Sequence, residues 1–161
     1  IAYETTHFMR QRKGGRDGLA AVKLDMSKAF DRVEWPFLEK IMLKLGFSNS
    51  WVQLVMRCVT TVTYRVKVNK NLTEVVVPQC GLRQGCPLSP YLFILCAEGL
   101  SALFHRAEED GSLQGVQVCP TAPKINHLFF ADDSLIFMKA NEPSARRLQE
   151  ILALYEDASA K

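Results

Sequence analysis

Three aspartates stand beside apolar stretches, where an ionised carboxylate is costly to bury unless a cation pairs with it. Asp25 follows the stretch of residues 19–24, and Asp132 and Asp133 separate two further apolar stretches. Neighbouring aspartates repel one another, and a bound metal ion removes that conflict. Carboxylates can hold two Mg²⁺ ions about 3.5–4 Å apart for phosphoryl transfer. The residue types are therefore compatible with a magnesium site, but taken alone an Asp-Asp pair is more commonly part of a tight turn that binds nothing.

A second segment with chemical potential is the loop of residues 79–90, which is punctuated by glycine and proline. Its glycines let the backbone approach a ligand closely, and the helix start that follows favours anions. Arg83 and Gln84 can donate hydrogen bonds there. Taken alone, the loop is more simply interpreted as a rigid connection between two elements. A basic cluster near the N-terminus, Arg10, Arg12 and Lys13, is on the same grounds usually a solvated surface.

The composition excludes several classes of protein. A chain that is 48% hydrophobic and 23% charged is typical of a globular domain, and not of a disordered tail or collagen. The net charge of +3 is too small to argue for a nucleic-acid partner, so any such contact must be local. The longest uncharged stretch, residues 84–97, is too short to span a bilayer, and no membrane association is expected.

The cysteines argue against a zinc site or a disulfide framework. All five lack C-x-x-C spacing, and the three histidines are scattered. We therefore expect reduced thiols, most of them buried, in an intracellular protein whose compartment, nucleus or cytoplasm, the sequence does not resolve. The chain starts at Ile1 and stops without a helix cap, so we expect it to be part of something longer.

The apolar patterns predict the elements that must position these residues. Helices are expected over residues 2–12 and 36–45, from Ser48 or Asn49 through Val59, over residues 91–106 and from 141 or 144 onward. Strands are expected over residues 19–24, 64–68, 75–77, 116–118, 125–130 and 135–138, and the turn residues 69–71 join 64–68 to 75–77 as a hairpin. In the helix that Ser48 or Asn49 begins, Trp51, Val52, Val55 and Val59 should face inward. The order mixes helices and strands without strict alternation. It predicts an α+β fold with one mainly antiparallel sheet backed by helices.

Three segments carry recognisable patterns: VKLDMSKAFDRVEW at 22–35, GLRQGCPLSPYLF at 81–93 and FFADDSLIF at 129–137. In this order and spacing they closely resemble motifs A, B and C of the reverse transcriptases of non-LTR (LINE-type) retrotransposons, especially those of plants. The similarity runs through almost the whole chain. It implies a polymerase palm that is incomplete at both ends, with residues 1–18 at the border of the fingers, residues 19–161 in the palm, and no thumb.

The resemblance also implies roles for single residues. Asp25, Asp132 and Asp133 match the catalytic, metal-binding aspartates, and Met26 matches the residue whose carbonyl joins the metal site. These residues would hold two Mg²⁺ ions, for which Mn²⁺ can substitute. Phe30 matches the bulky residue under the sugar of the incoming nucleotide, which leaves no room for a 2′-hydroxyl and so favours dNTPs.

Further contacts follow from the same resemblance. Gln84 and Gly85 match the motif B segment that frames the nucleotide and the template, and Lys28 and Arg83 are expected to contact phosphates. The basic cluster of Arg10, Arg12 and Lys13 is expected at the template strand, and such contacts are salt-sensitive. Independently of the resemblance, the residues themselves predict that Asp31 and Glu34 cap or pair locally at the start of the helix that Pro36 begins.

The resemblance implies an RNA-directed DNA polymerase that adds dNTPs to a DNA primer 3′-end on an RNA template. The fingers, the motif D lysine and the thumb would lie outside this chain, so the isolated chain is expected to be inactive or very weak. Two alternatives stay open: an inactive relic of a retroelement, and a domesticated nucleic-acid-binding module. The three intact aspartates count against a loss of chemistry within this window.

Overall fold

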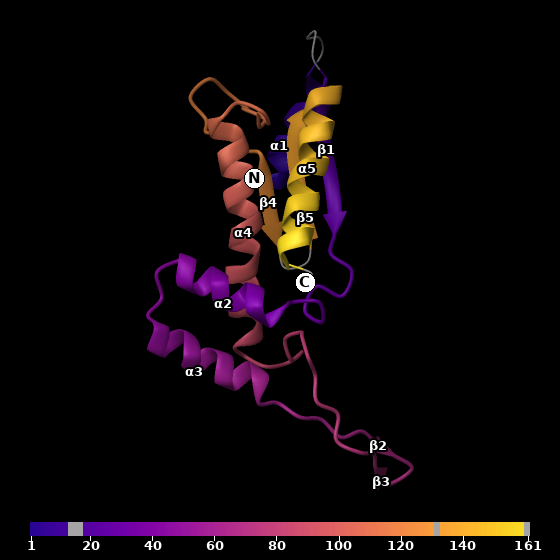
Figure 1. The fold of residues 1–161 in the computed structure, drawn as a ribbon. Helices are drawn as coiled ribbons and strands as arrows, with labels where there is room; N and C mark the ends of the chain where they lie inside the picture. The colour runs from indigo at the N-terminus through magenta and orange to yellow at the C-terminus, as the bar shows by residue number, and fades with distance from the viewer. Residues whose placement is uncertain (13–17, 131–132, 160–161) are drawn as a thin grey trace. The chain divides into compact units, whose positions relative to one another are not determined.

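The structure is a computed structural model that describes residues 1–12, 18–130 and 133–159 (Figure 1). Its contacts divide the chain into two compact units. Unit 1 contains residues 1–27 and 97–157, and unit 2 contains residues 28–96 and the C-terminal residues from Ala158. The long helix α4 (Ser89–Glu109) contributes its first turns to unit 2 and the remainder to unit 1.

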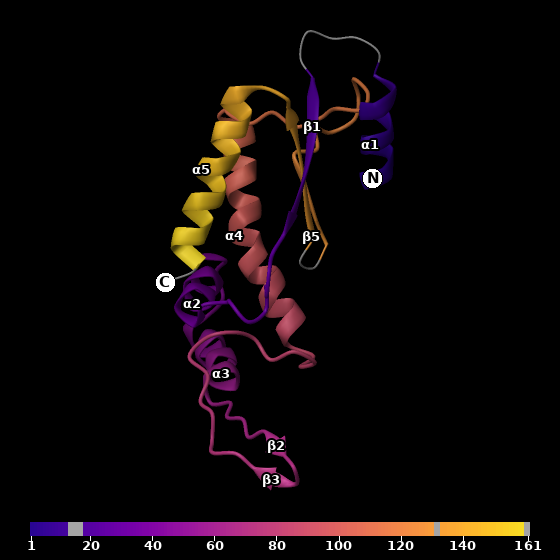
Figure 2. The same cartoon turned by 90° about the vertical axis from the view of Figure 1, so that its right-hand side faces the viewer.

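Unit 1 is built around a three-stranded antiparallel sheet with the order β1-β5-β4. Its strands are β1 (Leu19–Asp25), β4 (His127–Phe130) and β5 (Asp133–Lys139), and its other helices are α1 (Ala2–Gln11) and α5 (Glu142–Ser159). Figure 2 shows α4 and α5 on one side of this sheet and α1 on the other. The sheet confirms the predicted α+β class with antiparallel strands backed by helices.

The core of unit 1 lies between this sheet and the helices α4 and α5. The fully buried side chains of Ile136, Leu100 and Phe104 meet there, joined by Leu148 and Ile151 of α5. Val22 pairs with Ile136 in the register of β1 and β5, and its side chain packs against the same core. Because side chains alternate along a strand, the odd-numbered residues of β1 and β5 face away from this core.

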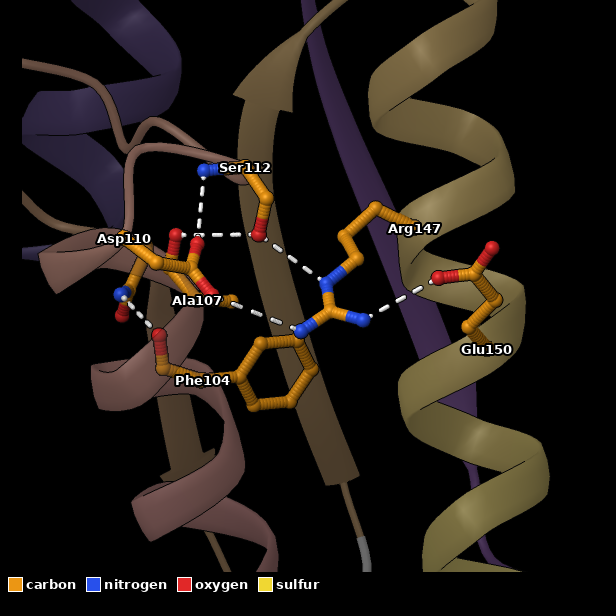
Figure 3. Close-up of polar contacts among 7 residues, drawn as sticks. Phe104, Ala107, Asp110, Ser112, Arg147 and Glu150 are labelled. Atoms are coloured by element: carbon orange, nitrogen blue, oxygen red, sulfur yellow. Dashed lines mark hydrogen bonds and ion pairs between the residues drawn. The ribbon is translucent and has the colours of Figure 1, made fainter.

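A charged cluster fastens α5 to the segment that ends α4 (Figure 3). The Arg147 Nε donates to the Ser112 Oγ over 3.0 Å, and its Nη1 donates to the Glu150 Oε2 over 3.1 Å. The Asp110 carboxylate lies 3.7 Å from the same guanidinium. Hydrogen bonds from Ser112, with a smaller contribution from Arg147, hold the pKa of Asp110 below its usual value. The cluster thus links α5 to the segment that follows α4.

Unit 2 contains helices α2 (Trp35–Lys44) and α3 (Asn49–Thr60) and a hairpin of β2 (Lys67–Val68) and β3 (Asn71–Leu72). Helix α2 has proline in its first turn and ends before Gly46, which has a φ of +90°. The Ser48 hydroxyl caps α3 by accepting a hydrogen bond from the Trp51 N–H. Leu38, Met42, Val52 and Val55 are the buried side chains of the two helices.

Four expectations about the fold were wrong. Trp51 is 49% exposed instead of facing inward, whereas its neighbour Val52 is buried. Residues 116–118 form no strand, and only a single bridge joins Val116 to Ile125. Residues 75–77 likewise form no strand, and only a single bridge joins Val76 to Tyr64. All five cysteines are free, as predicted, but only Cys96 is buried, so most of the thiols are not buried. Within the described residues, no helix is both long and apolar enough to cross a membrane.

Candidate active site

Asp25 and Asp133 lie directly opposite one another in the sheet of unit 1. Asp25 is the last residue of β1, Asp133 is the first residue of β5, and the register pairs them. Side chains opposed in this way have Cβ atoms about 4.5–5.5 Å apart and point to the same face. That face is the one turned away from the core between the sheet and α4 and α5. Asp132, the third predicted carboxylate, lies outside the described residues.

A lysine that sequence analysis missed completes this arrangement. The Lys23 Nζ lies 2.8 Å from the Asp133 Oδ1, and the two side chains are 64% and 50% exposed. Lys23 stands two residues before Asp25, so the alternation of β1 places both side chains on one face. The sequence contains a signal for this lysine. Lys23 is the one charge inside the otherwise apolar stretch of residues 19–24, and it lies two positions from Asp25, as residues on one face of a strand do.

An exposed aromatic side chain lies on the other flank of Asp133. Phe130 ends β4, pairs with Asp133 in the register, and is 83% exposed. Asp25, Asp133 and Phe130 therefore form one row across the three strands. A large ring held in water beside two carboxylates offers a stacking surface for a base.

The donor set of this row fits a hard divalent cation. Asp25 and Asp133 offer carboxylate oxygens, and the ammonium of Lys23 already acts as a cation on one of them. Within the described residues, no group of three or more His, Cys, Asp or Glu side chains could hold a metal ion. A complete site therefore requires a further ligand, and Asp132 is the predicted one. The side chain of Met26 packs against the core, and the role of its carbonyl stays a prediction.

The predicted nucleotide residues lie in unit 2, where the loop after β1 and the loop of residues 79–90 are joined by hydrogen bonds. The Gly81 N–H donates to the Val33 carbonyl over 2.8 Å, and the Leu82 N–H donates to the Phe30 carbonyl over 2.7 Å. The indole Nε1–H of Trp35 donates to the Gly81 carbonyl over 2.8 Å. These contacts bring segments of motifs A and B together within unit 2.

Asp31 contributes to the same junction. Its Oδ1 accepts a hydrogen bond from the Gln84 Nε2 over 3.3 Å, and its carbonyl accepts one from the Cys80 thiol. The expectation that its side chain caps or pairs locally was therefore wrong. Glu34 is the N-cap residue of α2, but its side chain makes no capping hydrogen bond. Asp31 instead holds the predicted nucleotide residue Gln84.

The ring of Phe30 packs against another aromatic ring and lines a cavity. It stacks on the ring of Phe93, with centroids 5.0 Å apart and an angle of 21° between the planes. The cavity has a volume of about 480 Å³, and its lining includes Phe30, Gln84, Gly85 and Cys86. Three of the predicted nucleotide residues thus line one cavity of unit 2.

The predicted basic contacts lie on the surface. Lys28 is exposed with a φ of +55°, and its carbonyl accepts hydrogen bonds from the N–H groups of Asp31 and Arg32. Arg83 is exposed, and its carbonyl accepts a hydrogen bond from the Ser89 hydroxyl over 2.7 Å. Arg10 and Arg12 are exposed at the end of α1, and Lys13 lies outside the described residues. Their contacts with nucleic acid stay a prediction.

The cavity beside Phe30 contains a polarised thiol. The Leu88 N–H is the main cause that lowers the pKa of Cys86, with further hydrogen bonds from Ser89 and the charge of Arg83. Cys96, seven residues beyond the start of α4, is in the opposite situation. Burial raises the pKa of its thiol to about 12. The two cysteines should therefore differ sharply in reactivity.

A polar network in unit 1 lies beside β4, among the side chains of α4. The Ser101 Oγ is 2.9 Å from the His127 Nε2, and the His127 Nδ1 contacts the Asn126 Oδ1. The Asn126 Nδ2 donates to the Glu108 Oε2 over 2.8 Å, so its Oδ1 is the acceptor for His127. His127 is therefore the Nδ1–H tautomer and accepts from Ser101. Burial, together with His105, lowers the pKa of His127 to about 4.

Comparison with known protein families gives a match over almost the whole chain. A family profile described as "Reverse transcriptase (RNA-dependent DNA polymerase)" matches residues 3–161. The chain is 62% identical over 67 residues to an uncharacterized mitochondrial protein of Arabidopsis thaliana, covering 42% of this chain and 55% of that protein. It is 28% identical over 130 residues to the Pol polyprotein of the type-1 retrotransposable element R2 of Popillia japonica, covering 81% and 20%.

A third relative extends the same pattern. The chain is 30% identical over 141 residues to the transposon TX1 uncharacterized 149 kDa protein of Xenopus laevis, covering 88% of this chain and 10% of that protein. The chain thus spans between a tenth and about half of the length of these relatives. The retrotransposon relatives confirm the resemblance drawn from motifs A, B and C.

Solved structures of telomerase share the fold. A Candida tropicalis telomerase in complex with a fragment of telomeric RNA aligns with a TM-score of 0.68 at 14% identity, covering 99% of this chain and 27% of that one. A truncated apo form of the same enzyme aligns with a TM-score of 0.65 at 16% identity, covering 98% and 31%. At such low identity the likeness concerns the fold, and it agrees with a palm-like α+β architecture.

Proposed function

Because this chain belongs to the reverse transcriptase (RNA-dependent DNA polymerase) family, we propose that it is the palm fragment of an enzyme that adds dNTPs to a DNA primer 3′-end on an RNA template. The observation that carries the proposal is the pairing of Asp25 with Asp133 at the exposed end of two strands. It puts two of the three motif carboxylates at one point of the sheet.

Asp25 and Asp133, together with Asp132, are the proposed ligands of two Mg²⁺ ions. Such ions, when bound, supply charge neutralisation for the attacking 3′-hydroxyl and the departing pyrophosphate. The contribution of the chain itself is to position the carboxylates. The β1–β5 register fixes the two carboxylates on one face, and the core under Val22 and Ile136 holds that register. The carbonyl of Met26 is the proposed additional oxygen ligand.

Phe30, Gln84 and Gly85 are the proposed contacts of the incoming nucleotide. The three residues line one cavity, and the stack on Phe93 keeps the Phe30 ring from moving aside. A ring fixed in this way excludes a 2′-hydroxyl by steric overlap, which accounts for a preference for dNTPs. Lys28 and Arg83 carry the positive charge proposed to meet phosphates.

Arg10, Arg12 and Lys13 are the proposed contacts of the template strand, and the exposed ring of Phe130 offers a stacking surface beside the carboxylates. Such contacts with phosphates would weaken as the salt concentration rises. The family match, whose description is an RNA-dependent DNA polymerase, supports a nucleic-acid template as the partner.

The test is primer extension on an RNA template with dNTPs and Mg²⁺. It should use the longest polypeptide that carries this chain, beside the variants Asp25→Asn and Asp133→Asn. Both variants should lose extension by orders of magnitude while keeping the wild-type circular dichroism spectrum. Glu109→Gln, which removes an exposed carboxylate at the end of α4, should extend like wild type.

Two other outcomes would change the assignment. No extension by a folded wild-type protein that includes fingers and thumb would favour an inactive relic. Binding of an RNA–DNA duplex without extension would favour a nucleic-acid-binding module instead. Wild-type rates in Asp25→Asn would remove Asp25 from the mechanism.

A further inference from the structure

We infer that Lys23 is an exchangeable counter-ion of the acidic pair, and that a divalent cation must displace its ammonium from Asp133 in order to bind. The inference rests on the proposed function, because it concerns the same carboxylates. It assigns a positioning role to a residue that lies in motif A but that the motif itself does not explain.

The pair of carboxylates requires a positive charge. Like charges that lie directly opposite in an antiparallel pair destabilise the sheet, and Asp25 faces Asp133 in this way. Lys23 is the diagonal neighbour of Asp133 on the same face, within reach of a long side chain. Its Nζ meets the Asp133 Oδ1 at 2.8 Å, the distance of a charge-assisted hydrogen bond. Lys23 therefore offsets the repulsion when no metal is bound.

The same contact puts the lysine in competition with a metal ion. Mg²⁺ and Mn²⁺ take carboxylate oxygens, and the Oδ1 of Asp133 already accepts from the ammonium. Two cations within a few ångströms repel one another, so both cannot occupy this oxygen. The ammonium must move away when the metal ion binds.

The exposure of the pair makes this exchange easy. The side chain of Lys23 is 64% exposed and that of Asp133 is 50% exposed. An exposed ion pair of this kind should change the equilibrium constant for metal binding by no more than about fivefold. Lysine also suits the role, because its single ammonium on a flexible stem binds less rigidly than the fork of arginine. The structure thus holds the acidic pair with a cation that is weak enough to leave.

The test is a Mn²⁺ titration of the longest polypeptide that carries this chain, without nucleotide, in which electron paramagnetic resonance counts the free ion. Lys23→Met should lower the dissociation constant for Mn²⁺ two- to fivefold, and Lys23→Gln should do the same. Lys23→Arg should raise it, because a guanidinium holds a carboxylate more firmly. Lys124→Met, which removes an exposed lysine of the same unit, is the matched control for charge and should match wild type.

Thermal unfolding gives a second measurement that does not depend on catalysis. Without metal, Lys23→Met should unfold at a lower temperature than Lys124→Met, and saturating Mg²⁺ should remove most of that difference. Asp25→Asn should abolish Mn²⁺ binding in every background, which ties the measured site to this pair.

The results separate this inference from the proposed function. Equal or weaker Mn²⁺ binding in Lys23→Met, with wild type binding normally, would overturn the counter-ion role alone. Absence of Mn²⁺ binding in both wild type and Lys23→Met would overturn the counter-ion role and the proposed metal site together. Binding that persists in Asp25→Asn would place the ion elsewhere and would also overturn the inference.

Discussion

The indole N–H of Trp35 donates to the carbonyl oxygen of Gly81 over 2.8 Å, although 46 positions separate the two residues. The N–H of the same glycine donates to Val33, so Gly81 is held on both its polar groups. This double attachment joins the segment that carries Phe30 to the segment that carries Gln84. The proposed nucleotide cavity of unit 2 therefore depends on a contact that neither motif contains alone.

Gly81→Ala should break this junction. Gly81 has a φ of +88°, and an added Cβ would lie 2.9 Å from the Asp31 carbonyl oxygen. We expect a loss of about 1–2 kcal/mol in the free energy of unfolding from the backbone conformation, and about 1–3 kcal/mol more from the forced contact. Urea unfolding measures both.

Gly46→Ala is the matched control for this prediction. Gly46 has a φ of +90°, and nothing lies within 4 Å of its added Cβ. It should show the backbone cost without the steric cost. Equal losses in the two variants would mean that the two loops yield without strain and that Gly81 does not hold them together.

Phe30→Ala should weaken discrimination against ribonucleotides. The substitution removes the ring that lines the cavity beside Gln84 and Gly85. We expect the ratio of kcat/KM for dNTPs to that for rNTPs to fall about tenfold or more, the scale on which a pocket discriminates one small group. Phe47→Ala, which removes a partly exposed ring elsewhere in unit 2, should leave the ratio unchanged. An unaltered ratio in Phe30→Ala would refute the steric role.

His127 should make the stability of unit 1 depend on pH. Burial, with His105 as a second cause, lowers its pKa from 6.5 to about 4. Between these values the unfolded chain binds more protons than the folded chain, so the free energy of unfolding falls as pH falls. The stabilising contribution is complete above pH 6.5 and is lost as pH falls through about 4.

Urea unfolding at a series of pH values tests this expectation. His127→Gln removes the titrating group and retains an oxygen that can accept from Ser101. The variant should therefore lose less stability than wild type between pH 6.5 and pH 4. Parallel pH profiles for the two proteins would show that His127 does not cause the loss.

Cys86 should react with iodoacetamide much faster than Cys96 at neutral pH. The thiolate is the reactive form, and hydrogen bonds from Leu88 and Ser89 lower the pKa of Cys86. Burial raises that of Cys96 to about 12. Mass spectrometry of peptides after timed alkylation gives both rates, and Cys86→Ser identifies the fast site. Comparable rates would show that α4 opens readily around Cys96.

Much of the fold follows from local patterns. The strand of residues 19–24 and a turn at Asn69 and Lys70, both with positive φ, depend on neighbouring residues, and both were predicted. The returning strand of that hairpin is Asn71–Leu72, however, and not residues 75–77. The strand order β1-β5-β4 was not, because it depends on pairing between residues more than a hundred positions apart. Trp51 was misplaced because helical periodicity cannot tell which edge of the buried face is covered.

The residues of the candidate site were likewise predicted from local signals, whereas the contacts between distant segments were missed. Residue types and motif order pointed to Asp25, Asp133 and Phe30, since those signals are local. The ion pair of Lys23 with Asp133 was missed because it depends on the register between two distant strands. The hydrogen bond from Gln84 to Asp31 was missed for the same reason, and local capping was predicted in its place.

Side chains along β1 and β5 alternate between the two faces of the sheet, and this alternation has a consequence for insertions and deletions. Adding or removing one residue between Leu19 and Leu24 would turn Asp25 to the buried face or force Val22 out of the core. A change of length there damages the site without touching a functional residue. The turn at Asn69 and Lys70, outside the sheet that carries the acidic pair, has no such constraint. Copies of this sequence that keep the acidic pair should therefore differ in length at that turn and never within β1.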